Sequence, residues 1–152
     1  MNQEKMLKRR LVRMILLLVM SLIAMTIFAA LYIDETKHTQ ETYRIQYKTN
    51  INHVVEDINS YQNGEGALDL RYRHLVNDMG SANSFIFLIE GMDEEKVIIN
   101  EINACLLLYP EQMQKEENLE KLKSAMEDIA ADLDKGYDET KALVDSIDKQ
   151  GL

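Results

Sequence analysis

Apolar residues along this chain form one uncharged run followed by four stripes at helical spacing. The run extends from Met14 to Ile33 without a charged residue. In the stripes, apolar positions recur three and four residues apart, which is typical of one face of an α-helix, and strand alternation is nowhere sustained. The stripes are Tyr43, Tyr47, Ile51, Val54, Ile58 and Tyr61; then Leu68, Tyr72, Leu75, Met79, Ala82, Ile86 and Ile89; then Ile98, Ile102, Cys105 and Tyr109; and finally Leu119, Leu122, Met126, Ile129, Leu133, Gly136, Thr140, Leu143 and Ile147.

The stripes predict an all-α fold with helices over about 35–62, 66–90, 93–109 and 114–149. Turn-forming residues separate the stripes, which supports these boundaries. Asn63–Gly66 offers left-handed positions after the first helix, and Gly91 ends the second. Asp93 is expected to cap the third helix, while Pro110 closes the third or opens the fourth.

Short connections between these helices predict antiparallel neighbours and therefore an up-down four-helix bundle. The first helix is expected to continue directly from the uncharged run. The fourth helix is then expected to run back toward the membrane. No single stripe is wide enough to stabilise a helix in water, but four stripes facing inward form a core.

The uncharged run over 14–33 is long enough to cross a bilayer, because twenty helical residues span about 30 Å. A cleaved signal peptide is the alternative, but bulky Phe28 stands where a cleavage site needs a small residue. Basic residues precede the run, and Asp34 and Glu35 follow it. Basic flanks stay on the cytoplasmic side. The sequence therefore predicts a single-pass cell-membrane protein with a cytoplasmic stub (1–13), a lipid-embedded signal anchor (14–33) and an extracytoplasmic domain (34–152).

The segment 34–152 is strongly acidic, with 25 Asp and Glu residues against 12 Lys and Arg residues. This balance disfavours nucleic acid as a partner, because no broad basic surface is available to follow phosphates. Cys105 is the only cysteine, so an intramolecular disulfide is impossible. We expect Cys105 to be a buried apolar residue, with an intermolecular disulfide as the alternative.

Metal and catalytic signatures are weak. A di-metal bundle needs two Glu-x-x-His pairs, and the chain has one such spacing, from Glu35 to His38. His53 with Glu56 or Asp57 also has ligand spacing, although two ligands on an exposed face commonly arise by chance. Nucleophile elbows and phosphate-binding glycine loops are absent from the sequence. We therefore predict a non-enzyme without metal or cofactor.

Two segments are candidate ligand sites. Arg71 and Arg73 beside Tyr72 would suit a carboxylate or phosphate. The alternative is an exposed face on which the arginines pair with Asp69 and Asp78. The second candidate is a notch of small and polar residues within the second helix, formed by Gly80, Ser81, Asn83 and Ser84. The alternative for the notch is a kink or a close approach between helices.

In the order of its parts, the chain resembles the four-helix-bundle sensor domains of bacterial chemoreceptors and related kinases. The resemblance implies a membrane-anchored module that senses a ligand or binds a protein partner, with a homodimer along the first helix as one arrangement. The alternative is a structural scaffold of the bacterial envelope, acting in division, secretion or sporulation. A sensor predicts a polar pocket near Arg71 or the notch, whereas a scaffold predicts an exposed apolar strip.

Overall fold

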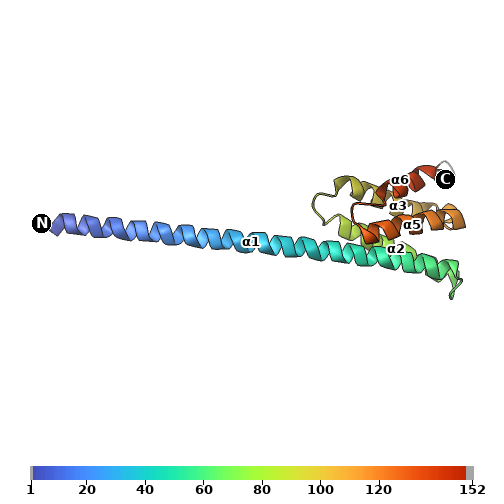
Figure 1. The fold of residues 1–152 in the computed structure, drawn as a ribbon, viewed down its shortest axis with the longest axis horizontal. Coiled ribbons are helices and arrows are strands. Elements are labelled where there is room, and N and C mark those ends of the chain that lie inside the picture. The colour runs from blue at the N-terminus through green and yellow to red at the C-terminus, as the bar shows by residue number, and fades with distance from the viewer. Residues whose placement is uncertain (1, 150–152) are drawn as a thin grey trace. The chain divides into compact units, whose positions relative to one another are not determined.

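The computed structural model describes residues 2–149, which form six α-helices and contain no strand. This confirms the all-α prediction. The helices are α1 (Asn2–Gln62), α2 (Leu68–Ile86), α3 (Asp93–Leu108), α4 (Pro110–Met113), α5 (Glu116–Ala131) and α6 (Tyr137–Ser146). Figure 1 shows α2, α3, α5 and α6 gathered beside the C-terminal part of α1.

The described chain divides into two compact units, with the boundary between Thr39 and Gln40 in the middle of α1. The first unit is helical and contains the uncharged run 14–33. Among the described residues, α1 is the one helix long and apolar enough to cross a bilayer, and none of its most apolar window is buried. The expected continuation of the run into the first helix is confirmed, because α1 is a single element.

The second unit has one hydrophobic core, built mainly from the stripes. Tyr47, Ile51, Val54 and Ile58 of α1 are fully buried, as are most stripe positions of α2 and α5. In the third stripe Ile102 and Cys105 are buried, but Ile98 and Tyr109 are only partly buried, and Ile99 and Leu106 fill the core instead. Leu68 is an exception, since it is 46% exposed at the start of α2. Side-chain periodicity therefore predicted the core closely.

Contacts near both ends of α2 show that α2 is antiparallel to the C-terminal part of α1. At one end the Gln40 side chain bonds to the Leu88 carbonyl, and at the other end the rings of Tyr61 and Tyr72 lie 6.2 Å apart. The Tyr72 hydroxyl in turn donates to the Leu106 carbonyl at 2.8 Å, so α3 is antiparallel to α2. We call the two ends of this unit the Gln40 end and the Gln62 end.

The predicted single helix over 114–149 is wrong. The chain forms α5, turns at Gly136 and returns as α6. Gly136 is buried and has φ +81°, a left-handed conformation that favours glycine. A Cβ atom at this position would lie 2.8 Å from Ile129 Cγ1 and still nearer the Ala125 carbonyl oxygen. The close packing of the turn against α5 therefore requires glycine.

The last helix also runs in a different direction from the prediction, because the chain reverses at Gly136. α6 begins near Tyr47, whose hydroxyl lies 3.2 Å from that of Tyr137. It ends near the Gln112 side chain, which bonds to both the N–H and the carbonyl of Asp148, at 3.0 and 2.8 Å. Two residues further along, Gln114 accepts a hydrogen bond from Tyr61. α6 therefore runs to the Gln62 end, and does not return to the Gln40 end as the expected fourth helix would.

Smaller corrections concern helix ends. α2 covers 68–86, shorter than the expected 66–90, because the chain turns before Gly91. Met92 occupies the N-cap position of α3, and Asp93 is the first helical residue, paired with Lys96 at 2.9 Å. Pro110 opens α4, a helix of four residues that was not predicted, and it lies two positions after Leu108, the last residue of α3.

Candidate functional site

The three residues of the predicted anion site point in different directions. Tyr72 is buried and uses its hydroxyl on Leu106, and burial raises the pKa of Tyr72 above its ordinary value. Arg71 donates from Nε to the Glu65 carbonyl at 3.0 Å, whereas Arg73 is exposed. Successive helical residues project about 100° apart. The structure therefore does not bring Arg71, Tyr72 and Arg73 together as one clamp.

The predicted notch forms part of the contact between α2 and α3. Ser81 and Ser84 donate to carbonyls of their own helix, at Asn77 and Gly80. Asn83 Nδ2 donates to Asn100 Oδ1 of α3 at 3.2 Å. A Cβ atom on Gly80 would lie 3.9 Å from Asn103 Oδ1, an ordinary van der Waals distance to the neighbouring helix. These contacts match the close-approach interpretation of the segment.

A cluster of titratable side chains lies between α1 and α2. Its members share one face of each helix by their spacing of three or four residues. We define this α1–α2 polar seam as His53, Asp57, Arg71, His74 and Asp78. His53 Nδ1 lies 4.0 Å from Asp78 Oδ2. The sequence pattern does not reveal this seam, because the pairing of positions on α1 with positions on α2 depends on the fold.

Asp57 is the electrostatic centre of the α1–α2 polar seam. Burial raises its pKa above the ordinary value, and the nearby carboxylate of Asp78 raises it further. The side chains of His74 and Arg71 lower the pKa of Asp57 and so oppose this shift. Asp57 Oδ2 is buried and has no hydrogen-bond partner among the described residues. A carboxyl group beside another carboxylate holds its proton more readily than an isolated one.

The acidic and histidine side chains of the domain could in principle ligate a metal ion. In residues 2–149, no group of three or more His, Cys, Asp or Glu side chains is arranged to hold a metal ion. The His53 and Asp57 pair noted in the sequence therefore gains no third ligand within this part of the chain. Glu35 and His38 are both exposed.

An acidic hollow of about 380 Å³ lies where the N-terminal part of α3 meets the α5–α6 turn. Lys135 is its basic member. Tyr137 also lines it, and burial raises the pKa of Tyr137 to about 12. A negatively charged surface attracts cationic groups and repels anionic ones. The carboxylates that line it are Glu94, Glu95, Asp128, Asp134, Asp138 and Glu139.

The outward side of α3 carries exposed apolar residues beside the polar residues Asn100 and Glu101. The predicted stripe did not include these apolar residues, because it followed the buried side of the helix. Val97 and Leu108 are 57% and 56% exposed, and their spacing places them on one side of the helix with Ala104 between them. Leu107, also largely exposed, borders this side. The signal in the sequence was the run Leu106–Leu108, which has more leucines than one buried stripe can hold. We call Val97, Ala104, Leu107 and Leu108 the α3 face.

Comparison of the chain with protein-family models, with curated proteins and with solved structures gives no significant match in any of the three. The likeness to chemoreceptor sensor domains therefore remains a resemblance in the predicted order of parts. The course of α6 also departs from that order, because in those receptors the fourth helix leads back into the membrane.

Proposed function

We propose that this chain is a non-enzymatic, single-pass membrane protein whose acidic helical domain binds a protein partner outside the cytoplasm. In this proposal, residues 1–13 are the cytoplasmic stub, 14–33 cross the membrane and 34–152 form the extracytoplasmic part. The α5–α6 hairpin takes the place of the fourth helix in the bundle. The cell envelope is bacterial, and the partner is a sensing or assembly protein.

The exposure of the uncharged run is the observation that carries this proposal. Every large apolar side chain in 14–33 is between 46% and 75% exposed. An apolar surface of this length is far larger than the patches that soluble monomers leave in water. Lipid can cover this apolar surface. Backbone groups in lipid must bond within the protein, and those of the run do so because the run is helical. The basic residues before the run and the acidic residues after it support a cytoplasmic N-terminus.

The α3 face supports a protein partner in preference to a small ligand. The side chains of the predicted anion site and notch are directed apart or engaged in contacts within the domain. The α3 face instead presents apolar side chains at helical spacing, which suits a partner helix. The same face favours the scaffold alternative, in which the domain holds another envelope component in place. A second copy of the chain is a further candidate for this surface.

Site-specific photo-crosslinking in intact membranes tests the proposal. A photoreactive residue at Val97 or Leu108 is expected to form a crosslinked protein species of defined mass. The same residue at Asp145, which is exposed on α6, serves as the control. Crosslinks of equal yield at all three positions, or lipid adducts alone, would contradict a specific protein interface on the α3 face.

A further inference from the structure

Two large apolar side chains project from the turn that connects α2 to α3. Phe87 is 54% exposed and Leu88 is 48% exposed. The residues on either side, Ile86 and Ile89, are fully buried in the core. The two buried residues fix the conformation of the turn, and in that conformation Phe87 and Leu88 are exposed to solvent.

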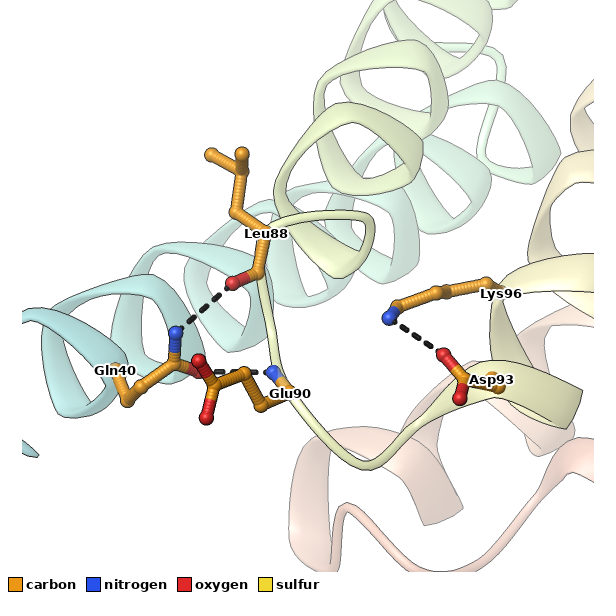
Figure 2. Close-up of polar contacts among 5 residues, drawn as sticks. All are labelled: Gln40, Leu88, Glu90, Asp93 and Lys96. Carbon is orange, nitrogen blue, oxygen red and sulfur yellow. Dashed lines mark hydrogen bonds and ion pairs between the residues drawn. The ribbon is translucent and has the colours of Figure 1, made fainter.

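Gln40 fixes this turn to the beginning of the second unit. Its side-chain amide donates from Nε2 to the Leu88 carbonyl at 3.1 Å, and its Oε1 accepts from the Glu90 N–H at 2.9 Å. Figure 2 shows this two-point bridge, with the Leu88 side chain projecting away from Gln40. Because one amide satisfies two backbone groups of the turn, the position of Phe87 and Leu88 follows that of Gln40.

Gln40 is only seven positions after Ile33, the last residue of the uncharged run. Seven residues of helix correspond to about 10 Å. The polar layer on each side of a bilayer is roughly 5–8 Å thick, from the difference between its total and hydrocarbon thickness. This short connection limits how far Gln40, and the turn bonded to it, can lie from the outer edge of the lipid headgroups when 14–33 span the membrane.

We infer that the α2–α3 turn inserts Phe87 and Leu88 into the headgroup region of the same bilayer that holds the anchor. This inference rests on the membrane anchor of the proposed function. Aromatic and leucine side chains are stable at this depth, where apolar surface leaves water while nearby polar groups stay hydrated. Glu90 and Glu94, both exposed beside the turn, give no attraction to anionic lipids. The contact is therefore apolar and needs no acidic lipid.

Tryptophan fluorescence of the full-length protein in vesicles tests this inference. The chain contains no tryptophan, so Phe87→Trp introduces a single emitting residue. Leu70→Trp is the matched control, because Leu70 has the same 54% exposure and lies on α2 near the Gln62 end. The 16 residues from Leu70 to Ile86 place the control roughly 24 Å along α2 from the turn. Leu88→Trp is a second reporter in case Phe87→Trp disturbs the turn.

The three variants are reconstituted separately in phosphatidylcholine vesicles carrying bromine at a shallow or a deep acyl position. Phe87→Trp and Leu88→Trp are expected to emit at shorter wavelength than Leu70→Trp and to be quenched most by shallow bromine. Phosphatidylglycerol is expected to leave this quenching unchanged.

The inference would be overturned if bromine quenched both reporters as weakly as Leu70→Trp in protein that sediments with the vesicles. That result would leave the membrane anchor intact. Protein that fails to sediment would overturn the anchor and the inference with it. A wavelength shift that depends on protein concentration in detergent, without bromine quenching, would assign the turn to a second copy and also overturn the inference.

Discussion

The hydroxyl groups of Tyr47 and Tyr137 lie 3.2 Å apart inside the domain, although 90 positions separate these residues in the sequence. Tyr47 is fully buried and Tyr137 nearly so. Burial raises the pKa of both tyrosines, and the neighbouring Tyr137 raises that of Tyr47 further. This polar pair is the direct link between α1 and the first turn of α6.

Removal of one hydroxyl from this pair is expected to destabilise the domain. Tyr137→Phe leaves the buried Tyr47 hydroxyl without its partner, and we expect a loss of about 1 kcal/mol in the free energy of unfolding. Urea denaturation of the detergent-solubilised protein measures this change. The double variant Tyr47→Phe with Tyr137→Phe is expected to cost less than the sum of the single changes, because no hydroxyl is then left unpaired. Additive losses would show that the hydroxyls do not interact.

Substitution of Gly136 tests the α5–α6 turn. Gly136→Ala is expected to lower the free energy of unfolding by at least about 2 kcal/mol. Alanine is strained in this left-handed backbone conformation, and its Cβ atom would also overlap with Ala125 and Ile129. Gly91→Ala is the control, since Gly91 has a similar φ of +78° and nothing within 4 Å of its added Cβ. We expect Gly91→Ala to cost about 1 kcal/mol from strain alone. Equal losses at the two positions would contradict the packing described for Gly136.

Neutralisation of Asp57 tests the α1–α2 polar seam. The pKa of Asp57 is raised above its ordinary 3.8 in the folded protein, so the folded state binds a proton more readily than the unfolded state. Stability from this group is present at low pH and is lost as the pH rises through the folded pKa. Asp57→Asn is therefore expected to raise the melting temperature at pH 7, with a smaller gain as the pH falls toward 4.

The control for this experiment is Asp145→Asn, which removes the same charge from an exposed position. Melting curves over a range of pH compare the two variants. A lower melting temperature for Asp57→Asn at pH 7 would show that ionised Asp57 stabilises the seam, contrary to this account.

The Cys105 thiol is expected to be unreactive in the folded protein. It is 3% exposed, and burial raises its pKa, so little of the nucleophilic thiolate forms at neutral pH. A maleimide reagent should therefore label the native protein slowly and the urea-unfolded protein quickly, as mass spectrometry would show. Fast labelling of native protein would restore the intermolecular disulfide as an alternative.

The sequence predicted the core well, because the buried residues on one face of a helix recur every three or four positions. Ile51 and Val54 of α1, and Leu75 and Met79 of α2, stand at the three- and four-residue intervals of their stripes and are fully buried. The turn at Gly136 was missed for a related reason. Buried Thr140 and Leu143 of α6 continue the spacing of α5, so the apolar pattern shows no interruption where the chain reverses.

The candidate sites were harder to predict, because they depend on which helix faces which. Asp57 and Asp78 meet through the register of α1 against α2, and no local pattern encodes that register. Gln40 is one polar residue among many in a helix, yet it fixes a turn 48 positions away. The exposed side of α3 was visible only once Ile99 and Ile102 were seen to fill the buried side.

Cysteine labelling in intact cells tests the membrane-anchored account most directly. In a Cys105→Ala background, single cysteines replace Gln3 or the exposed Glu127 of α5, and a membrane-impermeant maleimide is added. We predict full-length protein in the membrane fraction, with Glu127→Cys labelled in intact cells and Gln3→Cys labelled only after permeabilisation. The reverse pattern of labelling, or a soluble protein that lacks its first thirty or so residues, would contradict the account.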